Sequence, residues 1–221
     1  MYKPHVQHFL AIMADTFAER VPDMSETVAT LALLDDPLRE LLRQHALEVP
    51  VQGTLADEFS TLLDDPLNPF LRERLEGHFT GSAWLVSADG QRILLTHHRK
   101  LDRWLQLGGH ADGDRDLARV ALNEAEEESG LSGLSLDDPA IFDLDKHWIP
   151  ERHEVPGHWH YDVRFVIRAG ASEAFAISEE SLALAWRDIA QLAADPQADA
   201  SLQRMARRWL GSDGRWPSSR R

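Results

Sequence analysis

The chain has no cysteine among its 221 residues. Disulfide bonds, thiolate nucleophiles and zinc sites that contain cysteine are therefore excluded. Basic residues are scarce as well, because 23 lysines and arginines stand against 37 aspartates and glutamates, which gives a formal net charge of −14. A field of that sign disfavours nucleic acid and anionic membranes, so we expect neither as a partner.

Long apolar runs are missing too. The sequence has no stretch of 18 consecutive apolar residues, and the short apolar run near the N-terminus is broken by Asp15. We therefore predict neither a membrane span nor a signal peptide. With 43% hydrophobic residues, the chain is long enough for one good-sized core and an appendage, and we expect a soluble, cytoplasmic protein.

The pattern of apolar residues divides the chain. Residues 1–76 carry apolar residues at helical spacing, which predicts a helical extension. The sequence LLDDPL occurs at 33–38 and 62–67, and each copy predicts a helix start because proline suits the first helical position. We expect these helices to dock on the rest of the chain or on the second subunit of a homodimer. Residues 77–211 form the predicted main domain, and 212–221 a mobile tail.

From residue 80 onward the apolar pattern changes to that of short strands. A hairpin is predicted over 81–98 and a third strand over 103–107. A glycine-rich loop at 108–116 leads into a helix that Asp114 is suited to cap and that Gly130 ends. Further strands are predicted over 141–149, 158–169 and 173–177, followed by a last amphipathic helix near 198–210. Strands on both sides of a central helix predict a mixed α/β fold.

The central helix carries four glutamates in five positions. At 100° per residue, Glu124, Glu127 and Glu128 continue the apolar stripe of this helix, whereas Glu126 points the opposite way. A solvated acidic face would instead point outward, and acidic side chains near a helix C-terminus oppose the helix dipole. Clustered carboxylates on a partly buried face need protons or a cation, and their oxygens suit Mg²⁺ or Mn²⁺. We therefore predict a divalent metal site here.

The register of this segment resembles the signature of the Nudix hydrolases, G-x5-E-x7-R-E-U-x-E-E-x-G-U, in which U is a bulky apolar residue. Counting from Gly109, the glycines, the three glutamates named above and Leu131 match. Arg115 stands in place of the first glutamate and Asn123 in place of the arginine. The resemblance covers roughly residues 80–192, and it implies a Nudix-type mixed sheet sandwiched by helices, with the N-terminal helices as an extension.

The resemblance also implies an activity and its residues. The implied reaction is hydrolysis of a diphosphate linkage in a small-molecule substrate, typically a nucleoside diphosphate derivative. Mg²⁺ or Mn²⁺ would be held by the three glutamates and by the backbone carbonyl of Gly108. Glu127, Glu124 and Glu180 are the predicted catalytic residues, since by analogy the general base is a glutamate of the signature or a later carboxylate near Trp186. Glu179 is the second choice on that loop, and Asp114 can substitute for the missing first glutamate.

Histidines form a second group of candidate residues. On a strand, His158, His160 and Asp162 point to one face. Three interpretations stay open: a zinc site, a hydrogen-bonded histidine pair, or a pocket that meets phosphate or base. His97 and His110 are assigned to the substrate pocket with the same alternatives, and Trp104 either stacks on a base or fills core.

The departures at positions 115 and 123 support a rival function. A fold of this type without a complete signature can serve as a nucleotide-binding sensor. The three matching glutamates favour the enzyme, because a sensor needs no acidic cluster.

Overall fold

The structure is a computed structural model that describes residues 36–99, 102–152, 155–176 and 181–211. From Pro37 onward these residues belong to one compact unit. Residues 1–35 and the predicted tail at 212–221 lie outside the described ranges, so the domain boundaries at 76 and 211 stay predictions.

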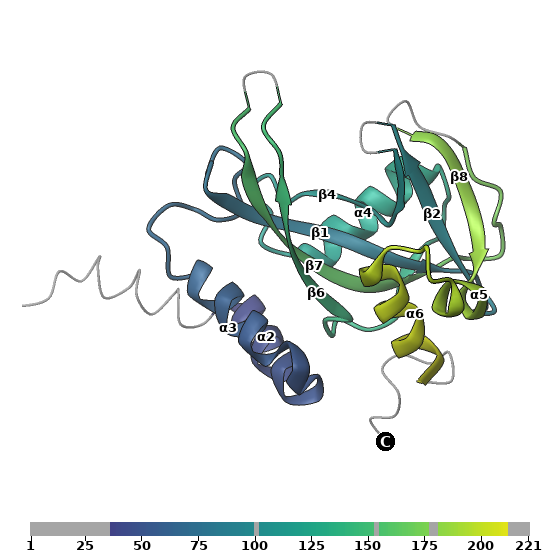
Figure 1. Cartoon of the computed structure of the whole chain (residues 1–221), viewed down its shortest axis with the longest axis horizontal. Coiled ribbons are helices and arrows are strands. Elements are labelled where there is room, and N and C mark those ends of the chain that lie inside the picture. The colour runs from purple at the N-terminus through teal and green to yellow at the C-terminus, as the bar shows by residue number, and fades with distance from the viewer. Residues whose placement is uncertain (1–35, 100–101, 153–154, 177–180, 212–221) are drawn as a thin grey trace, which may run out of the picture. The chain divides into compact units, whose positions relative to one another are not determined.

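Helices and strands follow one another as the sequence pattern suggests (Figure 1). The helices are α2 (Pro37–Glu48), the 3-10 helix η1 (Pro50–Gln52), α3 (Gly53–Leu62), α4 (Leu117–Ser129), α5 (Ile189–Ala194) and α6 (Ala200–Gly211). The strands are β1 (Gly77–Val86), β2 (Arg92–His98), β3 (Arg103–Leu105), β4 (Leu107–His110), β5 (Ser135–Leu136), β6 (Asp143–Ile149), β7 (His158–Arg168) and β8 (Ser181–Asp188). Within the described ranges, none of the helices is long and apolar enough to cross a membrane.

All eight strands belong to one mixed sheet. At its centre β1 and β7 run parallel, in a register that extends from Gly77 opposite Trp159 to Val86 opposite Arg168. The other edge of β1 is shared by β4, which pairs with residues Thr80 to Ala83 in the middle of the strand, and by β2, which pairs at Val86. Strands β3 and β8 pair with β2, while β5 and β6 pair with β7. The predicted mixed α/β architecture is confirmed.

Helices cover both faces of this sheet. Successive side chains of β1 point in opposite directions, so this strand contacts helices on each side. On one face Gly81 meets Val120 and the backbone of Leu117 of α4. On the other face Trp84 and Val86 belong to a buried cluster with residues of α5 and α6, such as Ile189 and Trp209. Figure 1 shows α4 and α6 on opposite sides of β1 and β7.

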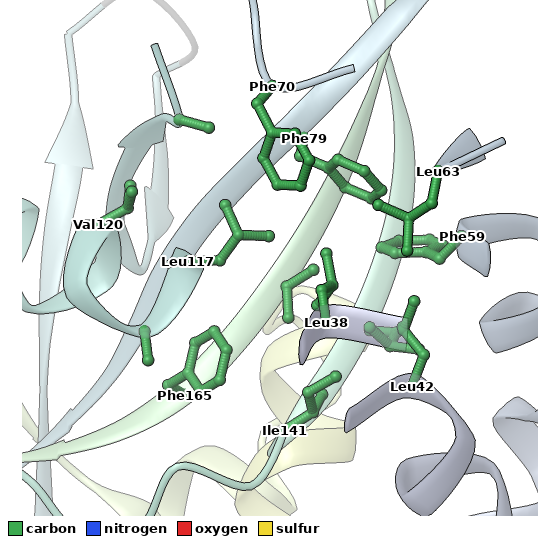
Figure 2. Close-up of a cluster of buried hydrophobic side chains, with 14 of the residues drawn as sticks. Leu38, Leu42, Phe59, Leu63, Phe70, Phe79, Leu117, Val120, Ile141 and Phe165 are labelled. Atoms are coloured by element: carbon green, nitrogen blue, oxygen red, sulfur yellow. The ribbon is translucent and has the colours of Figure 1, made fainter. Parts of the chain in front are cut away.

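The helices α2 and α3 share a core with the sheet. Figure 2 shows Leu42 of α2 and Phe59 of α3 in the same cluster as Phe79 of β1 and Phe165 of β7. Phe59 lies 6.0 Å from Phe79 between ring centroids, and both rings are fully buried. Because apolar burial is the main stabilising term in folding, this shared core ties the two helices to the sheet.

A buried polar chain makes a second connection between these helices and the sheet. His45 of α2 contacts the carbonyl of Ile141 through Nδ1 at 3.0 Å and Oε1 of Gln52 through Nε2 at 2.6 Å. The amide of Gln52 then donates to Oδ1 of Asp143 on β6 at 2.9 Å. Buried polar groups need partners, so this series of hydrogen bonds favours one docked position of α2.

Three local predictions were wrong. The second LLDDPL copy does not start a helix: α3 ends at Leu62, and the carboxylate of Asp65 accepts the amide of Leu67 and the guanidinium of Arg74 in a turn. The predicted strand at 103–107 is two strands, because β3 pairs with β2 whereas β4 pairs with β1. The described part of the predicted strand at 173–177 is irregular, and the amide of Ala176 donates to the carbonyl of Ser129 at the end of α4.

Candidate functional site

The helix that carries the glutamates begins and ends at defined residues. Asp116 is its N-cap and accepts the amide of Arg119 at 3.1 Å. The prediction that Asp114 caps the helix was therefore wrong by two residues. Gly130 ends the helix with φ of 65°, a left-handed conformation that glycine adopts without strain, as predicted.

Two of the three predicted metal-binding glutamates lean onto β4. The amide of Gly108 donates to Oε2 of Glu128 at 3.3 Å. A Cβ added at Gly109 would lie 2.7 Å from Oε2 of Glu124 and closer still to Oε1, so this carboxylate occupies the space that the glycine leaves. Glu124 and Glu128 are half-buried, whereas Glu127 is exposed. Carboxylate oxygens beside strand backbone are the donor type that Mg²⁺ and Mn²⁺ prefer.

The structure shows what surrounds Arg115 and Asn123, the two residues that depart from the signature. The guanidinium of Arg115 lies over the ring of Phe70, 4.5 Å from its centroid. Asp114 pairs with Arg119 at 2.6 Å and accepts the amide of Asp116 at 2.9 Å. Its carboxylate is thus engaged at the start of α4, which does not favour Asp114 as a substitute metal ligand. Asn123 is exposed on α4.

Arg72 places a positive charge in the surroundings of Glu124. Arg72, which precedes β1, forms a bidentate pair with Asp112 of the loop between β4 and α4. The hydrogen bond to Asp112, partly offset by burial, raises the pKa of Arg72, and the charge of Glu124 contributes in the same direction. Arg72 thus adds a positive charge to the surroundings of Glu124.

The predicted bases on the later loop, Glu179 and Glu180, lie outside the described residues. The strand that follows them is β8, and its Trp186 donates its indole N–H to the carbonyl of Glu173 at 3.1 Å.

Three of the predicted histidines lie close together, and His78, which the sequence pattern did not indicate, lies beside them. His78 of β1, His110 of β4, and His158 and His160 of β7 each offer a ring nitrogen, and these nitrogens all lie within 4.8 Å of one another. Nε2 of His158 lies 3.2 Å from Nε2 of His160. Only the parallel pairing of β1 with β7 places His78 opposite His160, which is why alternation along β7 alone could not find it.

Three rings of this group, those of His78, His110 and His160, lie in buried surroundings that favour the uncharged form. Burial, reinforced by neighbouring charges, lowers the pKa of His110 to about 4 and that of His160 to about 2. Burial also lowers the pKa of His78. Neutral imidazoles keep a lone pair on one ring nitrogen, so the group is electrostatically suited to accept a proton donor or a metal ion.

Asp162 has a different task from the two histidines that precede it on β7. Its carboxylate is buried, accepts the hydroxyls of Thr80 at 2.9 Å and Ser82 at 2.7 Å, and pairs with Arg164 at 2.7 Å. Arg164 is buried as well and also meets Asp143 at 3.1 Å. Asp162 is thus committed to a network within the protein, which does not favour its predicted contact with substrate.

Trp104 and His97, the other predicted substrate residues, face each other on the paired strands β3 and β2. Their rings stack, with centroids 5.1 Å apart, and the guanidinium of Arg187 lies 5.6 Å from the Trp104 ring. Trp104 lines a cavity of about 340 Å³ together with Arg103, Arg187, Asp199 and residues of β2, α5 and α6. The lining residues do not include Glu124, Glu127 or Glu128, so this cavity and the acidic site are separate features of the described structure.

Some solved structures are similar to this chain at low sequence identity. No family model and no curated protein matches the sequence. Among solved structures, a Nudix-family hydrolase from Clostridium perfringens is 21% identical and aligns over 61% of this chain and 96% of its own, with a TM-score of 0.47. A MutT protein from Methanosarcina mazei Go1 is 15% identical over 63% of this chain and 97% of its own, with a TM-score of 0.48. A C. elegans Ap4A hydrolase is 13% identical over 60% and 95%, with a TM-score of 0.47.

At identities below 25% and TM-scores below 0.5, these likenesses carry no argument about the family or the activity of this chain. The segment that resembles the Nudix signature contains α4, and β4 supplies the glycines that precede this helix. What the chain does must therefore be argued from its own side chains.

Proposed function

We propose that the chain is a Mg²⁺- or Mn²⁺-dependent hydrolase of a diphosphate linkage in a small molecule of the nucleoside diphosphate class. The observation that carries the proposal is the convergence of Glu124 and Glu128 on the glycines of β4. Oxygen donors from one helix and one strand suit a hard divalent cation, and the −14 charge of the chain requires such a cation before a diphosphate can bind.

The residues divide the chemical work in a way that follows from their positions. A bound divalent cation neutralises diphosphate charge and lowers the pKa of an attacking water. Glu124 and Glu128, both half-buried, hold and orient such an ion. Glu127 is exposed on the same helix, and an exposed carboxylate keeps its lone pairs available to a water or a proton. We assign the general base to Glu127, with Glu180 as the alternative.

The test is hydrolysis of a panel of nucleoside diphosphate derivatives by the full chain with Mg²⁺ or Mn²⁺. We expect phosphate ester products with at least one compound, and we expect Glu124→Gln, Glu127→Gln and Glu128→Gln each to lose most of this activity, by roughly 10- to 100-fold or more.

The matched control for these variants is Glu126→Gln. It removes the same charge from the same helix at an exposed position outside the predicted ligand set, and it should keep activity within a factor of about two. Equal losses in Glu126→Gln and the other three variants would show a general charge effect and contradict the site.

A nucleotide-binding sensor is the second candidate, and one observation favours it. Arg115 stacks on Phe70 where the signature has a glutamate, and Asp114 is paired with Arg119, so the first acidic position of the signature has no counterpart among these described residues. Calorimetric binding of a nucleoside diphosphate derivative without turnover, in the presence of Mn²⁺, would favour the sensor over the enzyme.

A further inference from the structure

We propose that His78, His110, His158 and His160 form a tetrahedral site for a transition-metal ion of the Zn²⁺ type, separate from the glutamate site of α4. Four ring nitrogens from three strands lie within 4.8 Å of one another. Four imidazoles without cysteine or carboxylate suit Zn²⁺, Co²⁺, Ni²⁺ or Cu²⁺ better than Mg²⁺, which prefers oxygen.

The spacing of the nitrogens fits this ion. With Zn–N bonds of 2.0–2.1 Å, two ligands of a tetrahedral site lie about 3.3–3.4 Å apart. The Nε2 atoms of His158 and His160 are already 3.2 Å apart. No pair of these nitrogens is more than 4.8 Å apart, and ring shifts of about 1 Å, which small side-chain rotations provide, close that distance to the tetrahedral value.

Backbone carbonyls hold two of the rings in the orientation that a metal ligand needs. Nδ1 of His78 lies 3.2 Å from the carbonyl of Arg74, and Nδ1 of His158 lies 2.8 Å from the carbonyl of Pro156. A carbonyl only accepts, so each Nδ1 carries the proton and each Nε2 carries the lone pair. Such outer contacts to the second ring nitrogen accompany metal-binding histidines almost always.

An unpaired buried atom is the second, independent sign of a ligand. Nε2 of His78 is buried and has no hydrogen-bond partner among the described residues, and His78 is only 2% exposed. Leaving a buried polar atom without a partner is costly, and coordination of a metal ion would satisfy it. A simple hydrogen-bonded histidine pair would account for His158 and His160 but not for His78.

The location gives the ion a structural task. The four ligands connect β1, β4 and β7, and His110 directly follows the glycines that Glu124 and Glu128 approach. A bound ion would therefore fix the end of β4. Binding to the folded state alone raises the unfolding midpoint, and at 100 times Kd we expect a rise in Tm of about 5–10 °C.

The experiment uses the full chain without a histidine tag, stripped by a chelator and then loaded with Zn²⁺ or Co²⁺. We expect one ion per chain to remain after desalting, Co²⁺ absorption of the tetrahedral type, and X-ray absorption fine structure with an imidazole shell. These readouts need no substrate, so they are independent of the proposed hydrolase activity. Loss of the ion on desalting, or a shell of oxygen alone, would overturn the proposal.

Variants locate the site. His158→Ala combined with His160→Ala should abolish retention of the ion, whereas His98→Ala on β2 and Glu127→Gln on α4 should retain it. Unchanged retention in the double variant refutes the assignment. Where the double variant does not fold, the absorption spectra of the native chain decide, since they depend on no substitution.

Discussion

Gly109→Ala offers the sharpest test of the glutamate site. The added Cβ would lie 2.7 Å from Oε2 of Glu124, and real Cβ contacts under 3.0 Å essentially never occur. The colliding atoms are the far end of a flexible side chain, so the carboxylate moves and the strand does not. We expect a folded protein whose Glu124 carboxylate has shifted away from β4.

The size of the effect follows from that shift. Relief of the overlap with both carboxylate oxygens requires a displacement of about 0.8–1.2 Å, whereas a functional metal ligand must be held within about 0.5 Å of its productive position. Losses of 10- to 100-fold are typical when the support of a ligand is removed. At about 1.4 kcal/mol per factor of ten, Mn²⁺ binding should weaken by about 1.4–2.8 kcal/mol.

The assay is isothermal titration of Mn²⁺ into the chelator-treated chain, with the unfolding midpoint measured in parallel. Gly53→Ala is the control, because Gly53 has helical φ and ψ and an added Cβ meets nothing within 4 Å. It should leave Mn²⁺ affinity unchanged and stabilise the chain by about 0.4–1 kcal/mol. If Gly109→Ala bound Mn²⁺ as tightly as the native chain, Glu124 would not be a ligand in the position described.

Two further predictions concern other parts of the chain. Asn123→Arg should raise kcat/KM by about tenfold on whichever diphosphate the panel identifies. The reason is that a guanidinium one turn before Glu127 keeps this carboxylate ionised and oriented. Equal activity would indicate that another cation, with Arg72 as the first candidate, already does this. Leu42→Ala should lower the free energy of unfolding by about 2–5 kcal/mol because Leu42 is fully buried in the core shared with the sheet. All seven tryptophans lie beyond residue 83, so their fluorescence in a denaturant titration reports on the part of the chain that follows α2 and α3, and an unchanged midpoint would contradict joint unfolding. Leu47→Ala, at a residue that is 69% exposed on the same helix, should change stability by less than about 0.5 kcal/mol.

The sequence was informative where a periodic pattern and a tertiary contact act together. The apolar stripe and Gly130 predicted a helix over 115–129, which begins two residues later at Leu117. Its two half-buried glutamates, Glu124 and Glu128, are those nearest the centre of that stripe. Glu127 lies at the edge of the stripe and is exposed, so the wheel placed it too far inward.

The sequence failed where pairing between distant strands decides. His78 joins the histidine group only because β1 and β7 run parallel, and residues 78 and 160 are 82 positions apart. Asp162 has the same orientation on β7 as the histidines, but Thr80, Ser82 and Arg164 engage it first. Neither outcome is encoded in local periodicity, which reports the direction of a side chain and not its partner.

The two consecutive glycines of β4 explain how Glu124 and the buried Asp162–Arg164 network can lie on opposite sides of one strand. Successive strand residues face opposite ways, so Gly109 leaves space for Glu124 of α4 while Gly108 leaves space for the hydroxyl of Ser82. Ser82 in turn donates to Asp162, which pairs with Arg164. A side chain at 109 would displace a carboxylate, whereas one at 108 would meet the backbone of Gly81 at 2.8 Å, so the first change acts on the acidic site and the second on the sheet itself. The pair thus lets α4 and the buried Asp162–Arg164 network approach the same strand from both faces, which couples the position of Glu124 to the packing of the sheet.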